Sequence, residues 1–374
     1  STGMKADDLQ RVITDMQWDE AFEDALERNA RPQRRKGDDY DYPTEFRLSF
    51  SDGVLSIPLG LVQGQQTRQL IKSLVYKASA VQDFDTLPIP FRAVATDIET
   101  GEAYIFSSGD IVTAMRASMS LPALLAPVEY DGRLLVDGGM AMNIPVEVGQ
   151  QMGVDRVIVV DIGTPLKSRE EITSLLSVTS QTMGFLTRRN SLVQLDKMRP
   201  QDILVSPQLG PIGMLDFDQV ELIYQRGYEA ARALGEQLTH LGVDQATWGA
   251  YLAQRTLPAA VDSPIEFITI NNDGPVSDEL IRVRISQPLG QALDRERLVD
   301  DIATIYALNY WEIIDYDIVT DERGNGLRIS ARTASWGTDK LKLGLTTATD
   351  LDGNSEINIG GSFQRKGITD LGGE

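Results

Sequence analysis

Cysteine is absent from the 374 residues of this sequence. Disulfide bridges, a thiol nucleophile and thiolate metal sites are therefore excluded. Histidine is nearly absent too, because His240 is the only one. A histidine metal site is thus excluded by number, and a Ser-His-Asp triad would depend on this residue alone. His240 lies just before Gly242, where we expect a helix to end, and its predicted role is that of a helix-end residue favoured by the helix dipole.

Positive charge and long hydrophobic runs are also scarce. The 35 basic residues face 55 acidic ones, which gives a net charge of −20. Such a surface repels phosphates, which argues against a nucleic-acid partner. No apolar stretch reaches the roughly 18 residues that a membrane-spanning helix needs. Hydrophobic residues still make up 42% of the chain, and its length predicts two or three globular domains.

The ends of the sequence lack the usual marks of a complete chain. It opens with Ser1-Thr2-Gly3 and not with methionine, and no signal peptide is recognisable. We therefore expect a cut N-terminus and leave open whether a leader lies upstream. Residues 369–374 do not resemble a natural C-terminus either.

The first 240 residues alternate between predicted helices and strands, which is typical of an α/β domain. The run 156–162 is almost continuously apolar and β-branched, which predicts a parallel strand buried on both faces. A charged loop is predicted from Arg31 to Pro43. Helices are predicted over 4–29, 67–78, 109–118, 145–152, 168–196 and 217–254, and strands over 45–50, 53–58, 90–96, 202–206 and, as a pair, 126–136.

After residue 262 the predicted elements change. A strand at 265–270, an ambiguous segment at 278–285, a helix at 294–308 and strands at 313–319 and 327–333 give a small β-α-α-β-β unit. Residues 336–374 then alternate between apolar and polar positions around turn residues at 350–354, which predicts an antiparallel hairpin. Taken alone, such a hairpin fits an ordinary amphipathic pair of strands as well as the first hairpin of a transmembrane β-barrel.

Asp137 is an acidic residue whose sequence context fits a catalytic role. Asp137 follows the apolar run 134–136 and precedes Gly138 and Gly139, so a strand delivers a carboxylate into a turn without side chains. Such a turn lets a carboxylate approach another backbone and a reacting group. An Asp before Gly is more often simply a turn former, so the motif gains its meaning from the residues around it.

The wider block resembles a patatin-like phospholipase. Asp137-Gly138-Gly139 matches the acid motif of that family, and further blocks occur in the same order over about residues 1–235. These blocks are Gly60 to Gly64, Ala95-Thr96-Asp97, Arg116-Ala117-Ser118, Ser120 with Pro122, and Asn143 with Pro145. The resemblance implies an α/β hydrolase domain, a phospholipid or other acyl-ester substrate, a membrane interface and no cofactor. It also implies a Ser–Asp dyad in which Asp137 is the general base and Gly138 and Gly139 support it.

The nucleophile of that family is missing from the sequence. No Gly-x-Ser-x-Gly occurs anywhere in the chain. In the family this elbow lies shortly before the helix that residues 4–16 resemble, so we expect the serine and the glycine-rich oxyanion loop upstream of Ser1. The chain as given is then predicted to be inactive towards esters.

Other polar residues allow two interpretations each. Arg116, Ser118 and Ser120 fit the lining of a substrate pocket and equally a capped helix end with a surface charge. Asp97 is predicted to brace a loop, and a carboxylate pair with Asp137 stays open. The acidic stretches at 38–41 and 350–352 lack the spacing of an EF-hand, so we expect solvated loops there and no metal site.

The C-terminal part resembles a POTRA domain followed by the start of an Omp85-type outer-membrane barrel. We therefore expect a patatin-like domain over 1–240, a linker over 241–262, a POTRA-like domain over 263–334 and the start of a barrel over 335–374. This order resembles a bacterial autotransporter. The resemblance implies a lipase that is located in the outer membrane, displayed on the cell surface or secreted. It also implies the outer-membrane insertion machinery as a partner. Two rivals remain: a translocation module with an inert patatin-like passenger, and a cytoplasmic esterase with an unrelated C-terminal domain.

Overall fold

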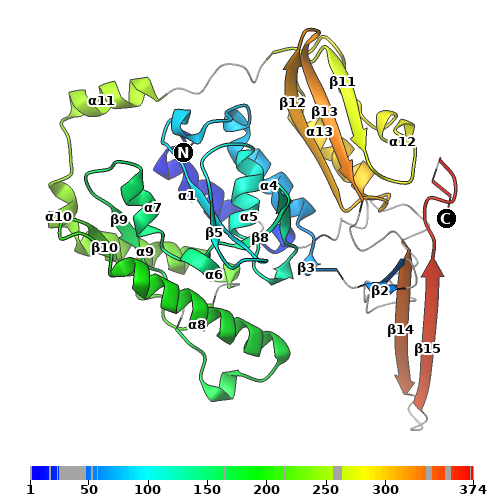
Figure 1. The fold of residues 1–374 in the computed structure, drawn as a ribbon, viewed down its shortest axis with the longest axis horizontal. Coiled ribbons are helices and arrows are strands. Elements are labelled where there is room, and N and C mark those ends of the chain that lie inside the picture. The colour runs from blue at the N-terminus through cyan, green and yellow to red at the C-terminus, as the bar shows by residue number, and fades with distance from the viewer. Residues whose placement is uncertain are drawn as a thin grey trace. The chain divides into compact units, whose positions relative to one another are not determined.

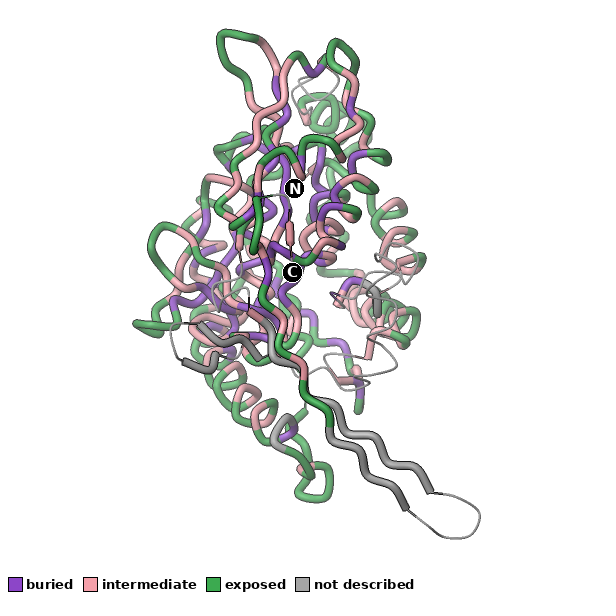
Figure 2. Tube along the Cα trace, turned by 90° about the vertical axis from the view of Figure 1, so that its right-hand side faces the viewer, coloured by how far each residue is buried: buried purple, intermediate pink, exposed green. Residues whose placement is uncertain are grey.

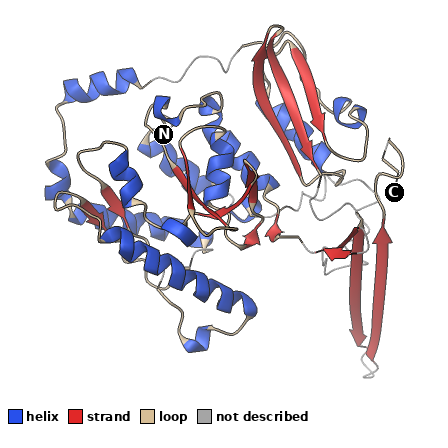
Figure 3. Cartoon of the chain, viewed as in Figure 1, coloured by secondary structure: helices blue, strands red, loops and turns tan. Residues whose placement is uncertain are grey.

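A computed structural model describes most of the chain: residues 2–16, 18–22, 24, 48–51, 54–56, 58–163, 165–213, 216–255, 263–333, 339–349, 355–370 and 372–373. Figure 1 labels its helices and strands along the chain, and Figure 3 colours them by type. The chain divides into two compact units. The first comprises Ser1–Ala21, Ile71–Pro122 and Pro127–Pro258, and the second Phe22–Leu70, Ala123–Ala126 and Ala259–Glu374. Within the described ranges, no helix has both the length and the apolar character that crossing a membrane requires.

An antiparallel sheet in the order β5-β4-β8-β7 lies at the centre of the first unit. Its strands are β4 (Ala93–Asp97), β5 (Ala103–Phe106), β7 (Val128–Tyr130) and β8 (Arg133–Asp137). Helix α5 (Ile111–Ser118) packs against β4 and β8, and it begins where the Asp110 carboxylate accepts the N–H groups of Val112 and Thr113. The strand predicted at 90–96, the strand pair at 126–136 and the helix at 109–118 are confirmed, whereas β5 was not predicted. Apolar residues of this region form one buried core.

A second sheet of the first unit pairs β9 (Ile158–Val160) with β10 (Ile203–Val205) in parallel, as expected. The prediction that this strand is buried on both faces is wrong. Val159 is buried, but Ile158 is 49% and Val160 54% exposed. The reason is that β9 has one partner strand in the part of the chain that the structure describes, and a two-stranded sheet buries little surface.

Long predicted helices are interrupted in the structure. The segment 4–29 gives α1 (Ala6–Asp15) and α2 (Trp18–Ala21), because Met16 is extended; its last residues lie outside the described ranges. The segment 217–254 contains a 3₁₀ turn at Phe217–Gln219 and three helices, which are α9 (Val220–Ala233), α10 (Gly235–Thr239) and α11 (Gln245–Gln254). The other helices are α4 (Gln65–Val75), α6 (Gly139–Met142), α7 (Val146–Gln151) and α8 (Leu175–Leu195), with 3₁₀ turns at Tyr76–Ala78, Phe84–Thr86 and Arg169–Glu171.

The second unit contains the expected β-α-α-β-β order. Its elements are β11 (Phe267–Asn272), α12 (Glu279–Arg282), α13 (Arg295–Tyr306), β12 (Ile313–Asp321) and β13 (Gly324–Arg332). The sheet order is β11-β13-β12, with β11 parallel and β12 antiparallel to β13. Apolar residues of α13, including Leu298, Ile302 and Ile305, pack into a core built within residues 265–331. Figure 2 shows buried and exposed residues alternating along the helices and strands.

The predicted C-terminal hairpin is present as β14 (Lys340–Thr349) and β15 (Ser355–Gln364), whose register pairs Leu341 with Phe363 and Leu345 with Ile359. The short strands β1 (Leu48–Ser51) and β2 (Val54–Ser56) extend this sheet in the order β15-β14-β1-β2. Separately, β3 (Gly60–Val62) pairs in parallel with β6 (Ala123–Leu125). The loops expected at 31–43 and 350–354 lie outside the described ranges.

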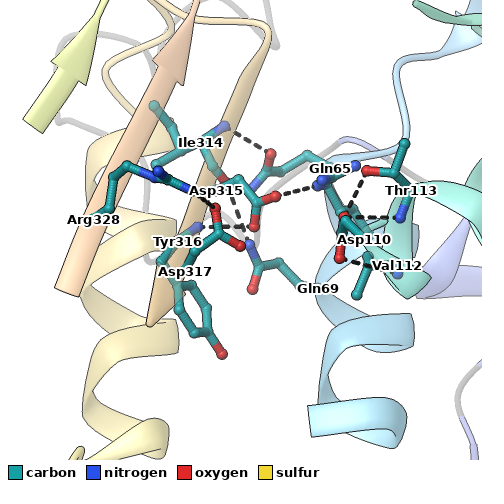
Figure 4. A network of polar contacts seen from close by, with 11 residues as sticks. Gln65, Gln69, Asp110, Val112, Thr113, Ile314, Asp315, Tyr316, Asp317 and Arg328 are labelled. Carbon is teal, nitrogen blue, oxygen red and sulfur yellow. Dashed lines mark hydrogen bonds and ion pairs between the residues drawn. The ribbon is translucent and has the colours of Figure 1, made fainter. Parts of the chain in front are cut away.

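The edge strand β12 is covered by side chains from the beginning of α4 (Figure 4). The buried Gln65 amide accepts the Ile314 N–H at 3.0 Å and donates to the Ile314 carbonyl at 2.9 Å. Arg68 forms an ion pair with Asp315, and Gln69 donates to the Ile314 carbonyl at 3.3 Å. Since an uncovered edge strand invites pairing with another chain, these side chains close this part of β12 to strand addition.

Candidate active site

Strand β8 holds Asp137 at a fixed place in the first unit. The Asp137 N–H donates to the Ser120 carbonyl at 2.9 Å, and the Asp137 carbonyl accepts the Thr96 hydroxyl at 2.8 Å. Thr96 in turn accepts the Ala141 N–H at 3.1 Å, which ties β4 to the start of the next helix. Hydrogen bonds at both its N–H and its carbonyl therefore fix the backbone of Asp137.

Close packing requires glycine at position 138 and leaves little room for a side chain at position 139. A Cβ atom on Gly138 would lie 2.1 Å from the Val94 carbonyl oxygen, so no other residue fits there without moving β4. The Gly138 N–H donates to the Ser118 carbonyl at 3.3 Å. The Gly139 N–H donates to Asp137 Oδ1 at 2.8 Å, which aims the first turn of α6 at the carboxylate. Both glycines were predicted to support Asp137, and the structure brings all three residues together.

The carboxylate sits in surroundings that favour its neutral form. Burial raises the pKa of Asp137 above its ordinary value of 3.8, and the hydrogen bond from Gly139 partly opposes this rise. In the described part of the chain, no lysine or arginine forms an ion pair with Asp137, and no hydroxyl group donates to its carboxylate. A carboxylate of raised pKa without a cationic partner is suited to accept a proton.

Helix α8 braces the turn from the other side. Asn190 Nδ2 donates to the carbonyls of Met140 at 2.6 Å and Gly139 at 3.3 Å. Asn143 donates to the buried Ser191 hydroxyl at 2.8 Å. Asn143 was predicted as a motif residue, but Asn190 and Ser191 were not. Nothing in the sequence around residue 190 indicates a partner about 50 positions earlier.

Comparison with known proteins identifies this region. Residues 5–149 match the family model of patatin-like phospholipases. This region is a patatin-like phospholipase domain. The match includes Asp137, Gly138 and Gly139, whereas α8 lies beyond its end.

Individual relatives resemble parts of the chain. An uncharacterized NTE family protein of Mycobacterium tuberculosis is 34% identical over 103 residues, which are 28% of this chain and 28% of that protein. A second such protein of this organism is 30% identical over 168 residues, or 39% of this chain and 29% of that protein. The lysophospholipase NTE1 of Phaeosphaeria nodorum is 26% identical over 191 residues, or 45% of this chain and 13% of that protein. The chain thus covers under a third of the length of each of these relatives.

Arg116 and Ser120 form an internal contact within the patatin-like domain. The buried Arg116 guanidinium donates to the Ser120 hydroxyl, which itself donates to the Arg116 carbonyl at 2.7 Å. This pair closes the end of α5, so the helix-end interpretation holds, while the expectation of a surface charge at Arg116 is wrong. Ser118 contributes its backbone carbonyl to Gly138.

Asp97 braces a turn, as expected. Its carboxylate accepts the Glu99 N–H at 3.0 Å and forms an ion pair with Arg133 at 3.2 Å. In the register of β4 and β8, Asp97 lies opposite Leu135, whereas Asp137 lies opposite Ala95. The two carboxylates therefore occupy different pairs of the ladder, and the structure gives Asp97 partners of its own.

His240 is exposed at the end of α10, in the helix-end position that was predicted. The Gly242 N–H donates to the Thr239 carbonyl at 3.0 Å. Within the described residues, no group of three or more histidine, aspartate or glutamate side chains could hold a metal ion. The acidic stretches at 38–41 and 350–352 lie outside those residues.

Proposed function

We propose that this chain is the acid-bearing part of a lipid acyl hydrolase that uses a Ser–Asp dyad. One observation carries the proposal: in a patatin-like domain, β8 ends at Asp137, whose partly buried carboxylate accepts a hydrogen bond from the Gly139 N–H. The 374 residues contain no Gly-x-Ser-x-Gly, and the proposal places the required serine upstream of Ser1. Under this proposal we expect the chain as given to be inactive towards esters.

In the proposed reaction, the upstream serine hydroxyl attacks the ester carbonyl and its proton passes to Asp137. Backbone N–H groups of an upstream glycine-rich loop stabilise the negative charge on the carbonyl oxygen. The leaving alcohol takes the proton from Asp137, which leaves an acyl-enzyme. Water then attacks this ester with Asp137 again as base, and the fatty acid departs. No cofactor takes part.

The proposed substrate is a phospholipid or lysophospholipid at a membrane interface. The NTE1 relative is named a lysophospholipase, and the family model is that of phospholipases. The net charge of −20 disfavours anionic lipid surfaces, so a zwitterionic headgroup is the better match.

We further propose that the C-terminal part delivers the hydrolase to the bacterial outer membrane or cell surface, or releases it there. The β-α-α-β-β order of residues 267–332 supports a POTRA-like domain, and the hairpin of β14 and β15 supports the start of a barrel. The outer-membrane insertion machinery would then be the partner of this part.

A second candidate is a translocation or assembly module with an inert patatin-like passenger. Within the described residues no hydroxyl group donates to Asp137, which both candidates allow. The two candidates differ in whether the natural protein carries a serine elbow ahead of this chain.

The deciding experiment uses the natural full-length protein with a short chromogenic ester and a zwitterionic lysophospholipid. We expect hydrolysis by the wild type and a loss of roughly 100-fold or more in Asp137→Asn, in line with the removal of a general base. Asp131→Asn is the matched control, because Asp131 is exposed in the turn before β8 and its positive φ of 51° suits asparagine. Equal activity of Asp137→Asn and wild type would remove Asp137 as the base. Absence of hydrolysis in the folded wild type would favour the inert passenger.

A further inference from the structure

Helix α6 is too short to be stable without hydrogen bonds from outside the helix. It has four residues, Gly139–Met142, and so leaves its first N–H groups and last carbonyls without partners inside the helix. The Gly139 N–H is accepted by Asp137 Oδ1, and the Ala141 N–H is shared between the Thr96 hydroxyl at 3.1 Å and the Gly138 carbonyl at 3.2 Å. The carbonyls of Gly139 and Met140 face α8 and are both bound by Asn190 Nδ2.

These hydrogen bonds connect Asn190 to the Asp137 carboxylate through Gly139. Asn190 fixes the carbonyl of Gly139, and the N–H of the same residue holds Asp137 Oδ1 at 2.8 Å. The space around Gly139 is tight, since a Cβ there would lie 3.0 Å from Asp137 Oδ1 and 3.2 Å from Thr187 Cγ2. A shift of α6 relative to α8 therefore moves the Gly139 N–H. Within the described residues this is the only group that donates a hydrogen bond to the Asp137 carboxylate.

We propose that Asn190 is a positioning residue for the reaction proposed above: by holding α6 from α8, it sets the orientation of the Asp137 carboxylate towards the nucleophile. This inference rests on the proposed function, because orientation matters only if Asp137 takes the proton. Asn190 does not touch the substrate or the reacting atoms and acts through Gly139. It lies about 40 residues beyond the segment that matches the patatin-like family.

Gln194 provides a matched control on the same helix. It is a buried side-chain amide one helical turn after Asn190, and it bonds the backbone of a neighbouring short helix by accepting the Glu147 N–H at 3.1 Å. That helix is α7, so Gln194 has the same kind of structural role, and within the described residues it forms no hydrogen bond to α6 or Asp137. A loss of general packing should affect Asn190→Ala and Gln194→Ala alike, whereas a loss of positioning should affect Asn190→Ala alone.

The first test measures kcat and KM with the zwitterionic lysophospholipid in the natural full-length protein. We expect Asn190→Ala to lower kcat by roughly 10- to 100-fold with little change in KM, since small misplacements of a catalytic group have effects of that size. Asn190→Asp, which keeps the shape but loses the N–H₂ donor, should lose at least as much. Gln194→Ala should keep the kcat of the wild type. Equal kcat values in Asn190→Ala and Gln194→Ala would overturn the proposal.

The second test needs no activity and uses the 374-residue chain itself. The ¹³C carboxyl signal of Asp137 is identified by its loss in Asp137→Asn, and its titration is followed by NMR. Weakening the bond from Gly139 should move the titration of Asp137 to higher pH in Asn190→Ala, because that bond stabilises the ionised form. Gln194→Ala should titrate as the wild type does.

The two tests separate failure of this inference from failure of the proposed function. An inactive wild type would refute the hydrolase, while the NMR titration would still decide whether Asn190 orients the carboxylate. An unchanged titration in both Asn190 variants would overturn the inference, whatever the activity. If both Asn190 variants fail to fold while Gln194→Ala folds, Asn190 is a determinant of the fold and the proposal is wrong.

Discussion

At the scale of single residues, the partly buried Asp137 carboxyl has a consequence for stability that can be measured without substrate. Its pKa in the folded protein is raised above 3.8 by burial, so folding favours the neutral form. This contribution is fully present below the ordinary pKa and is lost as pH rises through the raised value. Asp137→Asn, which stays neutral, should therefore raise the Tm at pH 7 and should lose this advantage as the pH falls below about 4. Calorimetry at the two pH values checks this, and a Tm difference that does not change with pH would contradict it.

Gly138 is the residue at which packing leaves least room. Gly138→Ala would bring Cβ to 2.1 Å from the Val94 carbonyl oxygen, and backbone of a buried strand cannot easily yield. We expect a loss of about 3 kcal/mol in the free energy of unfolding, at the upper end for overpacked sites. Gly227→Ala is the control, because Gly227 lies in α9 with open space around its Cβ position. That change should instead stabilise by about 0.5–1 kcal/mol. Urea denaturation giving both variants the same sign would refute the packing argument.

These residues also mark how far the sequence could predict the site. Asp137, Gly138 and Gly139 are adjacent in sequence and form one turn, so their grouping was predictable from local pattern alone. Asn190 was not, since its bond to α6 joins positions about 50 residues apart and depends on how α8 packs. Arg116 was open to two interpretations because the sequence could not tell a buried guanidinium from an exposed one.

At the scale of secondary structure, long periodic segments were predicted well and short or interrupted ones were not. The helix over 295–306 and the strands over 313–321 and 324–332 match expectation. The four residues of α6 have no helical pattern of their own, because their geometry is imposed by Asp137, Thr96 and Asn190. The apolar run at β9 predicted a parallel strand but neither its partner strand nor its exposure, which depends on what else packs there.

The contact between α4 and β12 gives a prediction at this scale. Gln65→Ala would leave the N–H and the carbonyl of Ile314 without the buried Gln65 amide. We expect a loss of about 2 kcal/mol in the free energy of unfolding and faster hydrogen exchange at the Ile314 amide. Gln69→Ala, which removes only the 3.3 Å contact, should cost less than about 1 kcal/mol. Unchanged exchange at Ile314 in Gln65→Ala would show that this contact does not protect the edge of β12.

At the scale of the whole molecule, the net charge of −20 is expected to weaken binding to anionic lipid surfaces. Repulsion from anionic headgroups acts over a Debye length of about 30 Å at 0.01 M salt and about 8 Å at 0.15 M. We therefore expect the 374-residue chain to bind anionic phospholipid vesicles more weakly than zwitterionic ones at low salt, with the difference shrinking as salt is added. Co-sedimentation with vesicles of the two compositions measures it. Stronger binding to anionic vesicles at low salt would point to a local basic surface that outweighs the net charge.

The central claim is that a serine upstream of this chain works with Asp137. A fluorophosphonate probe tests it most directly, because it reacts covalently with an activated serine hydroxyl and releases fluoride. The natural full-length protein is labelled and digested, and the modified peptide is identified by mass spectrometry. We expect one labelled serine, in a Gly-x-Ser-x-Gly segment ahead of Ser1, and strongly reduced labelling in Asp137→Asn but not in Asp131→Asn. Labelling of a serine within residues 1–374, or no labelling of the folded protein, would contradict the account.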